Sequence, residues 1–112
     1  MGKSIVVLEG YEGIREAMQI ILSLEDYEIK SYESVKAFEN RDGNQPDLFI
    51  LDVMLPDGNG IEVCRVLKVI NTTTPVLIMI AHASLKEINQ GCAADDYIEK
   101  PDKVKRLFGG EA

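Results

Sequence analysis

The fold of this chain is decided by residues 47–60, DLFILDVMLPDGNG. Residues 48–51 form an apolar run without polar alternation, which is typical of a strand that is buried on both faces. The run stops at the carboxylate of Asp52, and the Pro, Asp-Gly and Asn-Gly that follow break the chain into a turn-rich loop. We therefore expect Asp52 at the carboxyl end of a central parallel strand, where open α/β sheets place their ligand crevice. The alternative is that Asp52 only ends the strand or caps the next helix.

Strand patterns and helix patterns alternate along the rest of the chain. Apolar runs predict buried strands over 3–8 and 76–81, and alternating patterns predict edge strands over 27–32 and 96–99. Helical spacing of apolar residues predicts helices over about 14–22, 34–40, 61–70, 84–92 and 104–108. Because crossovers between parallel strands are right-handed, we expect an α/β fold. It would be a flavodoxin-like, doubly wound five-stranded parallel sheet of order 2-1-3-4-5, with helices on both faces.

Two of the predicted helices have a defined local pattern. Ser34 is the expected N-cap of the short helix over 34–40, because its hydroxyl can accept a hydrogen bond from the first turn. The helix over 61–70 is expected to bury one apolar stripe. That stripe consists of Val63, Val66, Leu67 and Ile70.

Composition narrows the class of protein. The 112 residues are expected to form one domain, 1–112, with 109–112 as a tail. A net charge of −7 argues against a nucleic-acid-binding surface, which would be basic. The longest apolar stretch is too short to span a bilayer and no signal peptide is evident, so we expect a cytoplasmic location. Cys64 and Cys92 lack metal-ligand spacing and are expected to be buried free thiols.

The carboxyl ends of the predicted strands bring several polar side chains to one edge of the sheet. These are Glu9, Asp52, His82 and Lys100, with Ala81 next to the histidine. Carboxylate oxygens suit Mg²⁺, and a carboxylate can itself accept a phosphoryl group as a nucleophile. A lysine supplies a point charge for phosphoryl oxygens. The set indicates chemistry on a phosphoryl group, and a structural salt bridge between Lys100 and an acid is the alternative.

Three motifs then occur in order along the chain. They are DVMLPDGNG over 52–60, TPV over 74–76 and ADDYIEKP over 94–101. With them, the chain resembles the receiver domain of two-component response regulators over essentially all of its 112 residues.

The resemblance implies a function and a set of site residues. It implies that a histidine kinase or phosphotransfer protein phosphorylates Asp52, and that Lys100 contacts the phosphoryl group. It also implies a Mg²⁺ ion held by Asp52, Glu9 and the backbone carbonyl of Met54. Such a domain is a phosphoacceptor that assists its own phosphoryl transfer, and we do not expect an enzyme.

The chain departs from the family pattern around this site. Gly10 stands where the family has the second acid of a pair, so we expect weak Mg²⁺ binding. Ala81 stands where the family has a switch Ser or Thr, although the aromatic partner of that switch is kept as Tyr97. His82 replaces a small residue, and we expect it to pack or gate rather than act as a base.

Three hypotheses follow for the function. The first is a receiver that takes a phosphoryl group on Asp52 and relays it as a conformational change. The second is a degenerate pseudo-receiver that binds a protein independently of phosphorylation. The third is a flavodoxin-like enzyme or cofactor binder, which only the fold supports. The expected partners are a kinase and an output domain or downstream protein, without direct nucleic-acid or membrane binding, and homodimer formation stays open.

Overall fold

The computed structural model describes residues 3–41, 45–70, 73–80 and 95–99. Its helices are α1 (Glu12–Leu24), α2 (Val35–Glu39) and α3 (Gly60–Ile70). Its strands are β1 (Ser4–Leu8), β2 (Glu28–Tyr32), β3 (Leu48–Asp52), β4 (Met54–Leu55), β5 (Gly58–Asn59), β6 (Val76–Ile80) and β7 (Asp96–Glu99).

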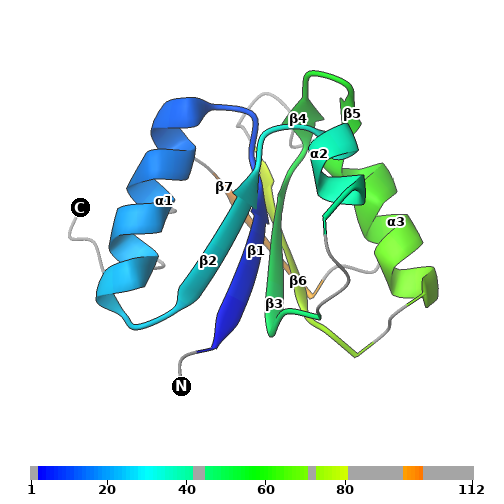
Figure 1. Cartoon of the computed structure of the whole chain (residues 1–112). Coiled ribbons are helices and arrows are strands. Elements are labelled where there is room, and N and C mark those ends of the chain that lie inside the picture. Colours follow the sequence, from blue (N-terminus) through cyan, green and yellow to red (C-terminus); the bar gives the residue numbers. More distant parts are fainter. Residues whose placement is uncertain (1–2, 42–44, 71–72, 81–94, 100–112) are drawn as a thin grey trace.

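Five of these strands form one parallel sheet in the order β2-β1-β3-β6-β7 (Figure 1). The strands β4 and β5 form a separate antiparallel hairpin, which the sequence predicted only as a turn-rich loop. Because the hairpin adds two strands to the numbering, the observed order is the predicted order 2-1-3-4-5. The doubly wound α/β fold is therefore confirmed.

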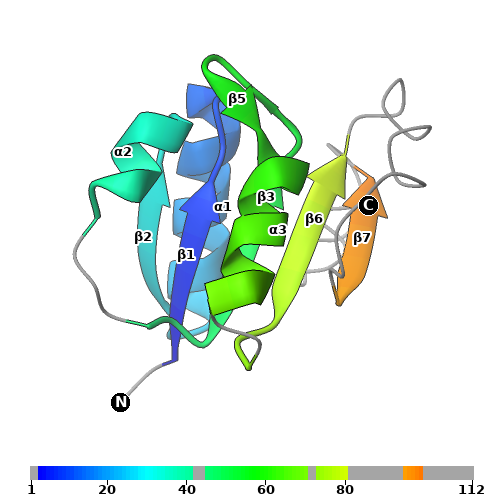
Figure 2. The same cartoon turned by 90° about the vertical axis from the view of Figure 1, so that its right-hand side faces the viewer.

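The sheet is covered on both faces (Figure 1 and Figure 2). The helix α1 lies on one face, and α2 and α3 lie together on the other. Alternate residues of the strands feed these two layers, because successive side chains of a strand point to opposite faces. In β1, Val6 and Leu8 join the core under α2 and α3, whereas Ile5 and Val7 join Met18 of α1. The strand β6 is buried along its whole length, as its apolar sequence predicts.

The sequence correctly predicts the start of the short helix α2, but it mispredicts which residues of α3 are buried. The Ser34 hydroxyl accepts a hydrogen bond from the Ala37 amide at 3.1 Å, which confirms Ser34 as the N-cap of α2. In α3, Leu67 is buried, but Val66 is 58% exposed and Ile70 is 71% exposed. The prediction that both belong to the buried stripe is wrong. Each residue turns the helix by about 100°, so a helix that rests on the sheet through Leu67 directs Val66 and Ile70 toward α2 instead. The helix α2 has only five residues and is too short to cover these two side chains.

The cysteine prediction is also wrong for Cys64, which is buried and disulfide-bonded. A count of two cysteines carries no information about which side chains the fold brings within bonding distance. Cys92 lies outside the described residues, as do the predicted helices over 84–92 and 104–108. Among the described helices, none combines the length and the apolar character that a membrane crossing requires.

Candidate functional site

The carboxylates of Glu9 and Asp52 end two neighbouring strands. In the parallel pair of β1 and β3, Leu8 lies opposite Leu51, so the two acids follow at the same level of the sheet. Both side chains are buried, with Glu9 0% exposed and Asp52 3% exposed. The sequence-based prediction that these two residues meet at the carboxyl edge is therefore confirmed. Buried carboxylates at a strand end are typical of a functional site rather than of a solvated surface.

The Glu9 carboxylate is oriented by the loop that joins β1 to α1. Its Oε2 atom accepts a hydrogen bond from the Tyr11 amide at 2.8 Å. The Arg15 guanidinium of α1 donates to the carbonyl oxygens of Glu9 at 2.9 Å and of Gly10 at 3.1 Å. Arg15 therefore holds two carbonyls of this loop from the first turns of α1. The sequence analysis did not single out Arg15, because no local pattern links it to the loop six residues earlier.

A close approach of backbone holds the other side of the site. The Gly60 amide donates to the Val53 carbonyl at 3.0 Å. A Cβ atom on Gly60 would lie 2.0 Å from the Asp52 carbonyl oxygen, so only glycine fits at the start of α3. Glycine thus lets the first turn of α3 lie directly against the end of β3. This contact fixes the backbone that carries Asp52.

The missing side chain at Gly10 leaves a defined space. A Cβ atom built there would lie 3.8 Å from the Met54 carbonyl oxygen and 3.3 Å from Cδ of Pro56. The Met54 residue itself is 63% exposed at the start of β4. An acid at position 10 would therefore place its carboxylate beside the same carbonyl that Mg²⁺ is expected to use. The chain has no side chain there.

Asp57 has a role that the sequence did not reveal. It lies in the turn between β4 and β5, as its Asp-Gly dipeptide predicts. Its carboxylate also accepts hydrogen bonds from the Val35 amide at 2.8 Å and the Lys36 amide at 3.0 Å, at the start of α2. These amides, Val35 first, hold the pKa of Asp57 below its usual range. The hairpin is thereby attached to α2 across more than 20 residues of sequence.

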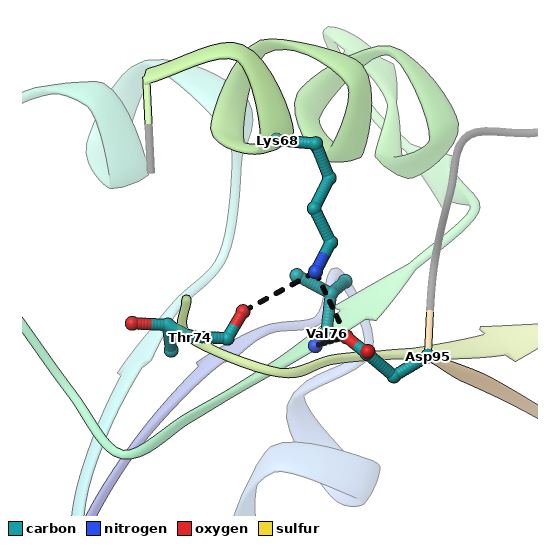
Figure 3. Close-up of polar contacts among 4 residues, drawn as sticks. All are labelled: Lys68, Thr74, Val76 and Asp95. Atoms are coloured by element: carbon teal, nitrogen blue, oxygen red, sulfur yellow. Dashed lines mark hydrogen bonds and ion pairs between the residues drawn. The ribbon is translucent and has the colours of Figure 1, made fainter. Parts of the chain in front are cut away.

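A second polar cluster lies at the opposite end of the sheet (Figure 3). The Oδ2 atom of Asp95 accepts hydrogen bonds from Lys68 Nζ at 2.9 Å and from the Val76 amide at 2.7 Å. Lys68 also donates to the Thr74 carbonyl at 3.4 Å. The Lys68 ammonium, followed by the Val76 amide, holds the pKa of Asp95 below its usual range. The cluster joins α3 to the strands β6 and β7, away from the two buried acids.

The remaining predicted site residues divide between the described and undescribed parts. Tyr97 lies in β7 opposite Ile78 and packs, partly buried, against the core under α2 and α3. Lys100, Ala81 and His82 lie outside the described residues. Among the described residues, no group of three or more His, Cys, Asp or Glu side chains is arranged to hold a metal ion.

Comparison with known proteins identifies the family. Residues 5–109 match the family described as "Response regulator receiver domain". This chain is a response regulator receiver domain. The receiver is 34% identical over 111 residues to the response regulator MprA of Mycobacterium ulcerans, and 33% identical over 111 residues to MprA of Mycobacterium tuberculosis. Each match covers 96% of the receiver and 48% of the relative, so the chain spans about half the length of these proteins.

Solved structures agree with this fold. The BeF3-activated DrrB receiver domain superposes with a TM-score of 0.85 at 28% identity, covering 97% of this receiver and 93% of DrrB. The response regulator TrrA from Thermotoga maritima, in complex with Mg²⁺ and BeF, gives a TM-score of 0.77 at 28% identity, covering 94% and 92%. Receiver domains act in two-component systems as phosphoacceptors, with histidine kinases and output domains as their partners.

The oxygen atoms of this receiver fit a magnesium ion, but with one carboxylate fewer than the family pattern, because Gly10 has no side chain. Glu9 and Asp52 would supply two buried carboxylates, and Met54 would supply a backbone carbonyl. Mg²⁺ is commonly bound in proteins by one or two carboxylates together with water and phosphate oxygens. The space beside Gly10 would then be left to water.

Proposed function

We propose that this receiver accepts a phosphoryl group on Asp52 from a histidine kinase or a phosphotransfer protein. The observation that carries the proposal is the pair of buried carboxylates, Asp52 and Glu9, at adjacent strand ends of a receiver fold. A carboxylate oxygen of Asp52 attacks the phosphorus, and the bond between phosphorus and the donor breaks with its electron pair leaving on the donor. The product is an acyl phosphate on Asp52.

The residues around Asp52 have separate roles in this proposal. Mg²⁺, when bound, neutralises negative charge on the phosphoryl oxygens. Glu9 is oriented toward this task by the Tyr11 amide, which fixes one of its oxygens at 2.8 Å. The rigid contact of Gly60 with the Asp52 backbone holds the nucleophile in place. Lys100 is proposed to contact the phosphoryl group.

The conformational relay is the finer part of the proposal. Tyr97 packs against the core beside β6 and would report the phosphorylated state. Because alanine at position 81 offers no hydroxyl for the phosphoryl group, phosphorylation would shift the conformational equilibrium less than a hydroxyl would allow. The proposal includes a cytoplasmic location and an output domain or downstream protein.

A pseudo-receiver is the second candidate, and Gly10 is the observation that favours it. With no acid beside the Met54 carbonyl, Mg²⁺ would bind too weakly to support transfer. The domain would then bind its partner in one state only.

One experiment separates these two functions. The protein is incubated with acetyl phosphate across a range of Mg²⁺ concentrations, and its intact mass is compared with that of Asp52→Asn. A phosphoryl adduct that the variant lacks supports the receiver. The absence of any adduct at every Mg²⁺ concentration overturns it in favour of the pseudo-receiver. An adduct that persists in Asp52→Asn shows that another residue is the acceptor.

A further inference from the structure

A groove of about 520 Å³ lies between α2 and α3, on the face of the sheet opposite α1. The two helices that form its walls lie on the same face of the sheet (Figure 1 and Figure 2). Its base is apolar and includes Phe38 of α2 with Val63 and Leu67 of α3. The groove is separate from Asp52 and Glu9, neither of which lines it.

The rim of the groove exposes aliphatic side chains one helical turn apart. Val66 is 58% exposed and Ile70 is 71% exposed, and both line the groove. A spacing of four residues places them on one line along α3. Aliphatic side chains in such a row are what the apolar face of a second helix contacts in a helix-in-groove interface.

The charges around the groove are mostly negative. Three carboxylates line it, from Glu39, Asp57 and Glu62, against one guanidinium, from Arg41. The Glu62 carboxylate is ion-paired with Arg65 of α3, so Glu39 and Asp57 carry the negative charge that this count rests on. The Asp57 carboxylate accepts hydrogen bonds from the Val35 and Lys36 amides, and no side-chain cation is needed to hold it at the groove. The Arg41 guanidinium stacks 4.0 Å from the ring centre of Phe38 and donates to the Phe38 carbonyl at 2.9 Å, so it is already engaged within the protein.

We propose that the groove between α2 and α3 docks a basic amphipathic helix of a partner protein. The apolar base and the Val66–Ile70 row would contact the apolar face of that helix. Lysine or arginine residues flanking this face would lie near Glu39 and Asp57. A second copy of the chain is a poorer occupant, because it would bring the same carboxylates and a net charge of −7 against this rim.

Two synthetic peptides test the proposal against the whole chain. Both have about 18 residues and the same leucine stripe at helical spacing, and they differ only in lysines or glutamates beside the stripe. Binding is measured by fluorescence anisotropy of the labelled peptide. We expect the lysine peptide to bind at least about tenfold more tightly than the glutamate peptide. Its affinity should fall as salt is raised. Equal binding of both peptides, or no binding of the lysine peptide, overturns the proposal.

Variants on α3 locate the binding surface. Val66→Asp should lower the affinity for the lysine peptide by about tenfold or more. Val69→Asp is the matched control, because Val69 is 82% exposed on the same helix and does not line the groove. It should change the affinity by less than about twofold. Equal losses in the two variants overturn the location, and circular dichroism confirms that both are folded.

A charge reversal tests the rim of the groove. Glu39→Lys should weaken binding of the lysine peptide several-fold. Glu16→Lys is the control and should not change it, because Glu16 is an exposed residue of α1 on the other face of the sheet. Analytical ultracentrifugation of the unmodified chain tests whether a second copy occupies the groove instead. A dimer that Val66→Asp dissociates would assign the groove to self-association and overturn the proposal.

Because Asp52 does not line the groove, Asp52→Asn should bind the lysine peptide with unchanged affinity. Failure here would therefore leave the phosphoacceptor proposal intact.

Discussion

Lys68 and Asp95 join the helix α3 to the strand β7 through a hydrogen-bonded ion pair of 2.9 Å between Nζ and Oδ2 (Figure 3). The same carboxylate oxygen accepts a hydrogen bond from the amide of Val76, a buried residue at the start of β6. A single oxygen thus fastens three elements, and its removal would leave a buried backbone donor without a partner.

The first prediction compares two substitutions at this carboxylate. Asp95→Ala should lower the free energy of unfolding by about 1–3 kcal/mol, because the buried Val76 amide loses its acceptor. Asp95→Asn keeps an acceptor oxygen for that amide and loses only the charge, so it should cost less than about 1 kcal/mol. Urea unfolding followed by circular dichroism measures both. Equal costs for the two variants would show that the amide contact contributes little.

The second prediction concerns acid stability. The pKa of Asp95 is lowered in the folded protein, first by Lys68 and then by the Val76 amide, so the unfolded state binds its proton more readily. The pair's contribution should be fully present above the unfolded-state pKa of about 3.9 and be lost as the pH falls below it. The stability difference between the parent protein and Asp95→Asn should therefore shrink from pH 7 to about pH 3. Lys68→Met should weaken the same acid dependence, and a difference that is constant with pH would contradict the assignment.

The third prediction restores a side chain at the proposed metal site. Gly10→Asp places a carboxylate near the Met54 carbonyl, in a space that only Cδ of Pro56 restricts. Mg²⁺ should bind more tightly by about tenfold or more, because a third carboxylate joins Glu9 and Asp52. Calorimetric titration measures the affinity. Gly13→Asp is the control, since Gly13 lies three residues later, in the first turn of α1, where an added Cβ atom would stand in open space. Similar gains in both variants would attribute the effect to net charge alone.

The fourth prediction tests the backbone contact behind Asp52. Gly60→Ala would force a Cβ atom to within 2.0 Å of the Asp52 carbonyl oxygen, so it should destabilise the protein by about 3 kcal/mol or more. Gly13→Ala adds a methyl group in open space within α1 and should leave stability unchanged or raise it by up to about 1 kcal/mol. Thermal and urea unfolding compare the two. A Gly60→Ala protein as stable as the parent would show that α3 can shift away from β3.

The sequence alone was sufficient to predict the sheet and the place of Glu9 and Asp52 at its carboxyl edge. Uninterrupted apolar runs predicted the central strands and alternating patterns predicted the edges, because only a central strand is buried on both faces. Once the strand order was known, Glu9 and Asp52 had to meet at the carboxyl edge. The Ser34 cap could also be predicted, since it depends on an amide only three residues away.

Only the tertiary structure decided the contacts between distant segments. Asp57 reaches the start of α2 across 22 residues, and Asp95 reaches Lys68 across 27, and no local pattern specifies either pair. The orientation of α3 was likewise undetermined, because its apolar residues span more of the helix surface than the sheet can cover. The fold buries Leu67 and leaves Val66 and Ile70 exposed beside α2. Periodicity shows which residues can share a face, but the neighbouring elements determine which part of that face is buried.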